Sequence, residues 1–159
     1  MHPVLRRKDR KMSKEFCEQL LDQSEYLTIS MVNPDGSPYA VPISHVREGG
    51  YLYFHCAQKG QKIDCLSQNN QICFSCVGKI SMPEDSYTVG YESCIGMGTV
   101  SPVLEEDEKI HALFLLAKKY FPSHLELFER EIQKSFHAVC VYKIMISHLS
   151  GKANRLLEK

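Results

Sequence analysis

The sequence predicts a mainly β protein, a small antiparallel barrel of six strands with short peripheral helices. Six runs rich in alternating apolar residues are separated by turn signals built from Gly, Pro, Asn and Asp. The first of these runs are joined by hairpin-length connections, which favours antiparallel pairing. Two glycines inside one long run favour the sharp curvature of a barrel. The predicted strands span residues 26–32, 39–46, 51–55, 71–77, 91–103 and 136–147.

The details of two strands refine this prediction. The Asn-Pro-Asp-Gly segment at 33–36 is strong turn chemistry between the first two strands. Pro42 has no N–H to donate, so the second strand should lie at a sheet edge or be interrupted there. In the fifth strand, Gly96 and Gly98 predict a bulge, a sharp bend, or the close approach of another backbone or a ligand.

Short helices are expected before and between the strands. Ser13 can cap a helix that runs to Gln23, and another short helix begins near Gly60. The clearest helix spans 105–121, and Pro122 ends it. Its apolar stripe consists of Ile110, Leu113, Phe114, Ala117 and Phe121. One more short helix is indicated by Leu125, Phe128 and Ile132.

Composition narrows the class of protein. The length suits one domain, so we expect residues 1–159 to form a single unit with a basic arm over 1–12. The 19 Lys and Arg residues balance 19 Asp and Glu residues, which argues against a nucleic-acid binder. No apolar run is long enough to cross a membrane, and the amino terminus lacks the apolar core of a secretory signal. We therefore expect a cytoplasmic protein.

The seven cysteines are expected to be buried small hydrophobes. An odd count without a secretory signal argues against a disulfide framework. Cys73 and Cys76 form a CxxC pair, but on a strand side chains three residues apart point to opposite faces. No second CxxC and no HxxxH completes a tetrahedral site, so we predict no metal site.

A strand end followed by a helix start carries the first candidate site. N–H groups at a helix start attract anions, and Lys59 and Lys62 add two positive charges there. With Gly60 and Gln61 they could hold one phosphate, or they could form a solvated helix start with two surface lysines. His55, on the preceding strand, is the best placed histidine for chemistry.

Two further segments are candidates. Pro42 leaves backbone groups of the neighbouring strand unpaired, and these groups and the Ser44 hydroxyl could hydrogen-bond the edge of a planar ring. The alternative is an ordinary edge strand. At Gly96 a flat group could approach the backbone, or the glycine could form a bulge at a barrel corner.

Several motifs, in their order and spacing, resemble a known family. The main ones are Pro38-Tyr39-Ala40-Val41-Pro42, Tyr53-Phe54-His55-Cys56-Ala57 followed by Gly60-Gln61-Lys62, Tyr91-Glu92-Ser93-Cys94-Ile95-Gly96-Met97-Gly98, and the segment 144–152. Together they cover nearly the whole chain. The chain resembles the pyridoxamine 5′-phosphate oxidase-like flavoproteins, and within them it looks most like the 5-nitroimidazole-resistance (Nim-type) branch.

The resemblance implies an FMN-binding split barrel of six antiparallel strands. It also implies a homodimer with flavin at the subunit interface, FMN being the expected cofactor and FAD the alternative. Carried over by matching motif, Lys62 with Gln61 and Gly60 would hold the flavin phosphate. The remaining implied site residues are Pro42, Ile43 and Ser44 along the ring or ribityl chain, Phe54 and His55 lining the same site, and Ser93, Cys94, Ile95 and Gly96 approaching from the partner subunit.

The resemblance further implies that reduced flavin passes electrons to a small planar acceptor. In the Nim-type branch this is a nitroimidazole antibiotic, whose nitro group is taken to the amine. His55 would donate a proton or orient the acceptor, unless it is a structural histidine.

Pyridoxamine phosphate oxidases proper grip the substrate phosphate with arginine and histidine residues near the carboxyl terminus. The final segment, 154–159, has one arginine and no such set, which argues against vitamin B6 oxidation. The alternatives are a flavin reductase or oxidase with another substrate, and a non-enzymatic flavin- or haem-binding protein.

Overall fold

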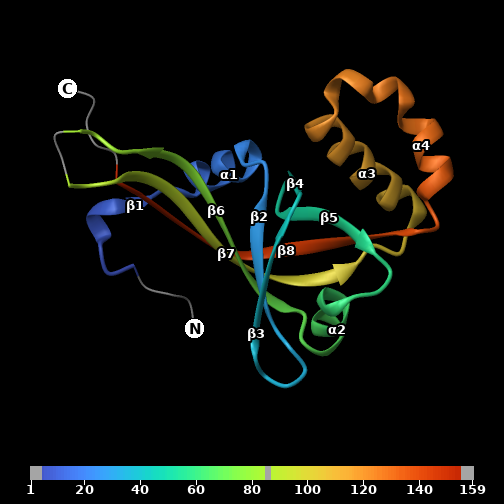
Figure 1. Ribbon diagram of the computed structural model, residues 1–159, viewed down its shortest axis with the longest axis horizontal. Coiled ribbons are helices and arrows are strands. Elements are labelled where there is room, and N and C mark those ends of the chain that lie inside the picture. The colour runs from blue at the N-terminus through green and yellow to red at the C-terminus, as the bar shows by residue number, and fades with distance from the viewer. Residues whose placement is uncertain (1–4, 85–86, 155–159) are drawn as a thin grey trace.

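One antiparallel sheet forms the body of the protein, in the order β3-β2-β6-β7-β8-β5-β4, with β1 paired to β8 (Figure 1). The computed structural model describes residues 5–84 and 87–154. The strands are β1 Lys11–Met12, β2 Leu27–Val32, β3 Pro38–Ile43, β4 Val46–Glu48, β5 Tyr51–Ala57, β6 Gln71–Ser81, β7 Gly90–Pro102 and β8 Val139–Asn154. The α-helices are α1 Lys14–Gln23, α2 Gln61–Gln68, α3 Glu106–Tyr120 and α4 Phe128–Ser135, and the 3-10 helices are η1 Lys8–Arg10 and η2 Pro122–Leu127.

The sheet curls around a core without closing, because β3 and β4 lie at its two ends. β8 is the longest strand, with 16 residues, and it pairs with β7 along most of its length and with β5 near its start. Among the peripheral helices, α1 packs against β6, β7 and β8, while α3 packs against β4, β5 and β8 and contacts α4 (Figure 1). This arrangement is the split barrel that the sequence predicts.

Within the described residues the structure has eight strands, two more than the six predicted. The strand predicted at 39–46 is divided into β3 and β4, because the chain leaves the sheet at Ser44 and the buried His45. β1 is only two residues long, too short for alternation to reveal it. The prediction for Pro42 is confirmed, since it pairs with β2 in the edge strand β3.

Local signals correctly predicted the first two helices. α1 begins after Ser13, whose hydroxyl accepts a hydrogen bond from the N–H of Phe16 at 3.2 Å. α2 begins after Gly60, as expected. The last strand instead runs beyond the predicted limit of 147 to Asn154, because its second half pairs with β7 and β1.

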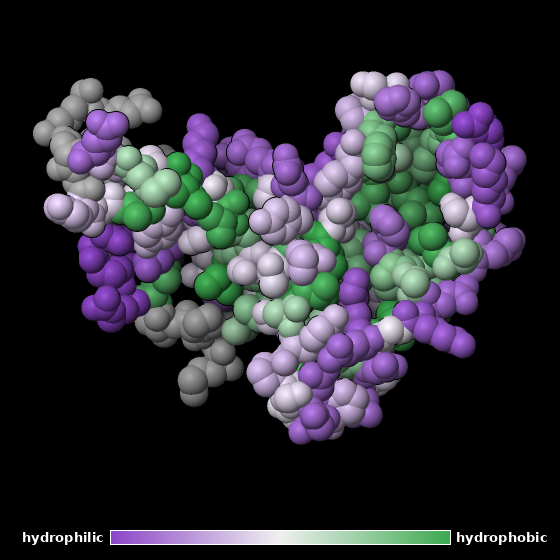
Figure 2. All heavy atoms as spheres, viewed as in Figure 1, coloured by the Kyte–Doolittle hydropathy of each residue, from purple (hydrophilic) through white to green (hydrophobic). Residues whose placement is uncertain are grey.

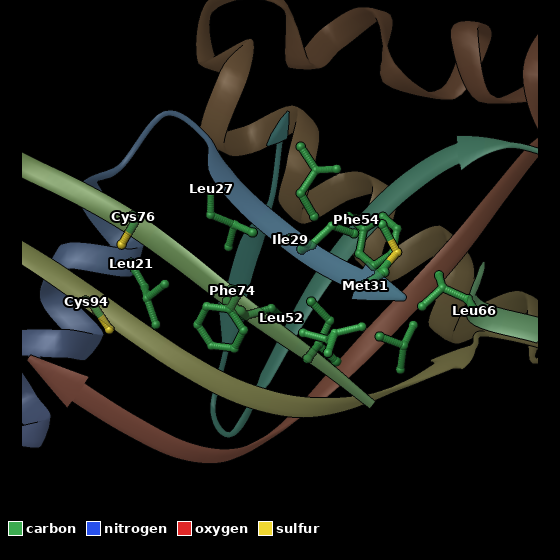
Figure 3. Close-up of a cluster of buried hydrophobic side chains, with 14 of the residues drawn as sticks. Leu21, Leu27, Ile29, Met31, Leu52, Phe54, Leu66, Phe74, Cys76 and Cys94 are labelled. Atoms are coloured by element: carbon green, nitrogen blue, oxygen red, sulfur yellow. The ribbon is translucent and has the colours of Figure 1, made fainter. Parts of the chain in front are cut away.

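The core fills the inside of the curved sheet (Figure 3). Side chains from β2, β5 and β6 point toward one another there, and Phe54 and Phe74 are its largest fully buried members. Burying a side chain of this size contributes about 1.5–3 kcal/mol. The labelled residues of Figure 3 are Leu21, Leu27, Ile29, Met31, Leu52, Phe54, Leu66, Phe74, Cys76 and Cys94.

A smaller apolar cluster joins α3 to the outer face of the sheet. It consists of Tyr53, Val103, Ala112 and Val141. The expected apolar stripe of this helix is therefore only partly right, because the buried residues are Ala112 and Leu116. Ile110, Phe114 and Phe121 of that stripe are exposed, with relative exposures of 40%, 38% and 64%.

Gly96 and Gly98 of β7 are required for different structural reasons. A Cβ at Gly96 would lie 2.1 Å from Cζ of Phe74, so the glycine makes room for a core ring. Next to Gly98 the register between β7 and β8 shifts, as a predicted bulge requires. At both positions the close neighbour belongs to this chain.

The two cysteines of the CxxC pair are arranged as expected for side chains three residues apart on a strand. Cys73 and Cys76 both lie on β6, where Cys76 is buried with an exposure of 4% and Cys73 is half-buried. All seven cysteines have free thiols. No group of three potential metal-binding side chains occurs within residues 5–84 and 87–154. No helix in the same ranges is long and apolar enough to cross a membrane.

Candidate functional site

The loop between β5 and α2 presents a helix amino terminus beside two lysines. Gly60 precedes the helix with a φ of 137°, a conformation that other residues rarely adopt. Its carbonyl accepts the N–H groups of Ile63 and Asp64, and no described side chain caps the helix. The first N–H groups of α2 therefore have no acceptor within the helix and can bind an anion.

Lys62 is held at the edge of the core. Its Nζ lies 5.6 Å from the ring centroid of Phe54. Phe54 is fully buried, and its ring stacks on Tyr142 with 5.6 Å between centroids. A cation over an aromatic face is attracted by the negative face of the ring. The positive charge is thereby kept beside the start of α2.

Asn33 fastens α2 to the turn between β2 and β3. Its Oδ1 accepts hydrogen bonds from Nε2 of Gln61 at 2.9 Å and from Sγ of Cys65 at 3.2 Å. Its Nδ2 donates to Oγ of Ser37 at 2.9 Å within the turn. Sequence reasoning assigned this asparagine to a turn only, because nothing local in the sequence indicates a contact 28 residues away.

His55 lies on the outer face of β5. Because side chains alternate along a strand, it points away from Phe54 and the barrel interior. It pairs with Val141, on the face that α3 covers. Partial burial, together with the positive charge of Lys62, lowers the pKa of His55. The imidazole is therefore mainly uncharged at neutral pH.

An apolar hollow of about 370 Å³ opens beside His55, between the sheet and the two late helices. Figure 2 shows hydrophobic residues gathered between α3 and α4. We call this hollow the α3–α4 pocket; it is lined by Ser44, His55, Leu113, Leu116, Ala117, Tyr120, Phe121, Phe128, Glu131, Ile132 and Ser135. Two predicted site residues, Ser44 and His55, thus come together at one cavity.

The other residues predicted to lie near the flavin ring differ in the exposure of their side chains. Pro42 is exposed at the sheet edge, whereas the Ile43 side chain is buried in the core with an exposure of 6%. Phe54 is buried in the same core. A ligand at this face could reach Ile43 and Phe54 only through their backbone atoms.

We call the stretch that carries Lys59 and Lys62 the lysine loop. Within one protomer, the segment 93–96 lies far from this loop. His55 pairs with Val141 on β8, while Ile95 pairs with Ser150 of the same strand. Nine residues separate those two β8 positions, which is about 30 Å of strand. One chain therefore does not bring the two groups of predicted site residues together.

Within that segment only one side chain is well exposed. Ile95 has an exposure of 45%, while Cys94 is fully buried near Cys17 and Cys76. The hydroxyl of Ser93 donates to the carbonyl of Lys152 at 3.2 Å. Gly96 is packed against Phe74.

The comparisons identify one family and a common fold. The family model described as pyridoxamine 5′-phosphate oxidase matches residues 13–153. No curated protein matches the sequence.

Solved structures share the architecture. A candidate 5-nitroimidazole antibiotic resistance protein from Bacteroides thetaiotaomicron is 24% identical, with a TM-score of 0.75, covering 91% of this chain and 90% of that one. A conserved hypothetical protein from Mycobacterium tuberculosis is 16% identical, with a TM-score of 0.81 and coverages of 96% and 91%. An FAD and heme binding protein from Mycobacterium smegmatis is 22% identical, with a TM-score of 0.76 and coverages of 92% and 74%.

Proposed function

We propose, because this chain belongs to the pyridoxamine 5′-phosphate oxidase family, that it is a flavin-dependent oxidoreductase with FMN as its cofactor and a small planar molecule as its electron acceptor. The observation that carries the proposal is the arrangement around β5. A cationic helix start follows the strand, and an uncharged histidine on the strand faces an apolar hollow. In the Nim-type interpretation, the acceptor is a nitroimidazole.

The lysine loop suits the phosphate end of the cofactor. Lys62 and the first N–H groups of α2 would bind the phosphate oxygens, and Gly60 lets the backbone turn toward them. Gln61 already donates to Asn33, which steadies the loop before any ligand binds. The chemistry of this donor set fits one phosphate.

The remaining contacts would come mostly from backbone and exposed polar groups. Pro42 and Ser44 would lie along the ring or ribityl chain, with Ile43 and Phe54 contributing backbone atoms because their side chains are buried. A bound flavin would supply the electron pair that the acceptor receives.

His55 would hold the acceptor by a hydrogen bond. Since its pKa is lowered, the uncharged imidazole predominates at neutral pH and offers one N–H donor. A nitro or carbonyl oxygen is a suitable partner for that donor. Delivery of a proton by the imidazolium form would become more important as the pH falls.

We further propose that the protein acts as a homodimer. The segment 93–96 lies about 30 Å of strand from the lysine loop, so a second copy would have to bring these residues to the flavin. The exposed Ile95 is the side chain best placed to do so.

The test is the spectrum and the mass of the ligand that purifies with the protein. We expect a yellow protein that releases FMN on denaturation, bleaches under an anaerobic electron donor, and recovers its colour when a nitroimidazole is added. Flavin that stays reduced after the nitroimidazole is added would contradict the proposed activity.

Two other spectra would assign a different function. Release of FAD would correct the cofactor while leaving the chemistry unchanged. A haem Soret band would indicate a haem-binding protein, an alternative supported by the structural likeness to the Mycobacterium smegmatis FAD and heme binding protein.

A further inference from the structure

We propose that the α3–α4 pocket is the acceptor site, and that it selects uncharged, flat aromatic molecules over anionic ones. This inference rests on the proposed function, because it assigns the electron acceptor of the same site.

The pocket has the size and the surface of a small-molecule site. Its volume of about 370 Å³ lies at the lower end of the usual range of about 300–1,000 Å³. Leu113, Leu116 and Ala117 present one face of α3, and Phe128 and Ile132 face them from α4. A single small ring system would fill this space and cover apolar side chains.

The polar groups of the pocket leave one place for a directional contact. The Tyr120 hydroxyl accepts the N–H of His45 at 2.9 Å and lies 2.6 Å from the carbonyl of Glu25, so it is already engaged. The Ser135 hydroxyl donates to the carbonyl of Glu131 at 2.9 Å. The Ser44 side chain interacts with the Tyr120 hydroxyl. The His55 ring, by contrast, has no hydrogen-bond partner among the described residues. An aromatic acceptor in the pocket would therefore be oriented by His55.

The charge of the pocket favours uncharged acceptors over anionic ones. Its lining contains one charged group, the carboxylate of Glu131, and no lysine or arginine. Glu131 is ion-paired on its exposed side with Arg130 at 3.1 Å and with Lys134 at 2.9 Å. An anionic acceptor would lose its hydration without gaining a cation, whereas a neutral ring would not.

The experiment measures binding of two probes of similar shape to the purified protein by equilibrium dialysis. 4-Nitrotoluene is uncharged, and 4-nitrobenzoate carries one negative charge. We expect the dissociation constant of 4-nitrotoluene to be lower than that of 4-nitrobenzoate by about tenfold or more. Equal dissociation constants would overturn the proposed selectivity.

Two neighbouring substitutions on α3 test the location. Ala117→Phe fills the pocket, whereas Lys118→Phe places the same side chain at an exposed position outside the lining. We expect Ala117→Phe to weaken binding of 4-nitrotoluene about tenfold or more, and Lys118→Phe to change it by less than about twofold. Unchanged binding by Ala117→Phe would overturn the proposal.

Two further measurements on the same samples distinguish the acceptor from other occupants of the α3–α4 pocket. Loss of flavin from Ala117→Phe alone would assign the pocket to the flavin ring. Conversion of a dimer to a monomer in sedimentation would assign it to a second copy of the chain. Either result overturns the acceptor assignment. Failure of the proposed function is distinguishable, because it appears as wild-type protein that lacks flavin or whose flavin stays reduced after a nitroimidazole is added, while probe binding requires no electron transfer.

Discussion

Nε2 of His45 lies 2.8 Å from the carbonyl oxygen of Leu21, in a part of the protein with no solvent exposure. Because a carbonyl only accepts, this hydrogen bond assigns the proton to Nε2. Nδ1 is then a buried nitrogen without a partner among the described residues. The contact ties the segment between β3 and β4 to the last turn of α1.

This relationship predicts a loss of stability in mild acid. Burial, with a contribution from the charge of Lys119, lowers the pKa of His45 to about 4. The unfolded chain has a histidine pKa of about 6.5, so it binds the proton more readily than the folded protein. The uncharged His45 therefore contributes about 3 kcal/mol to the free energy of unfolding. This contribution is complete above about pH 6.5 and is lost as the pH falls toward about 4.

The measurement is the unfolding free energy in urea across that pH range. His45→Gln should flatten the pH dependence relative to wild type, while His124→Gln, at an exposed position, should leave it unchanged. Parallel curves for wild type and His45→Gln would show that His45 does not carry the effect.

Lys62→Ala should weaken flavin binding. The substitution removes a charge-assisted contact worth about 1.5–3 kcal/mol, so the dissociation constant should rise roughly tenfold to a hundredfold. Fluorescence titration of the apoprotein with FMN measures the change, and Lys118→Ala is the matched surface control. If the two variants bind FMN equally well, Lys62 does not hold the phosphate.

Gly96→Ala should destabilise the fold whether or not flavin is bound. The new Cβ would lie 2.1 Å from Cζ of Phe74, a fully buried ring with little room to move. We expect a loss of about 3 kcal/mol in the unfolding free energy. Gly50→Ala is the control, because nothing lies within 4 Å of its Cβ, and it should stay within about 0.5 kcal/mol. Similar unfolding midpoints would contradict the packing role.

The two cysteines of the CxxC pair should differ in their effect on stability. Cys76→Ser places a hydroxyl in the core and should cost about 1–3 kcal/mol. Cys73→Ser lies on the other face of β6, where the half-buried thiol should tolerate the change within about 1 kcal/mol. Zinc content should be negligible in wild type and in both variants. If the wild-type protein binds zinc and each of the two variants loses it, the result would instead support a metal site shared by the two cysteines.

Signals that lie within a few residues of one another were sufficient to predict much of the protein. Ser13 predicted the start of α1, and the missing N–H of Pro42 predicted an edge strand. Gly60 predicted the start of α2, while the anion site expected at that helix start stays a prediction. These predictions depend on backbone conformation and local charge, which neighbouring residues control directly.

Long-range contacts decided the rest. Only the fold shows that Asn33 fastens α2, that Gly96 makes room for Phe74, and that His45 is buried against Leu21. Each of these contacts joins residues more than 20 positions apart, so no local pattern indicates them.

The sequence by itself determined the element types, the edge strand and the cationic helix start, because these follow from residues close together along the chain. Only the tertiary structure decided which face of α3 is buried. The apolar stripe predicted a helix but not its rotation, because packing of Ala112 against Tyr53 and Val141 leaves Ile110 exposed and places Phe114 against Phe128 of α4. That rotation also directs Leu113, Leu116 and Ala117 into the pocket beside His55. Helical periodicity repeats along one chain segment, whereas the rotation depends on surfaces that distant strands supply.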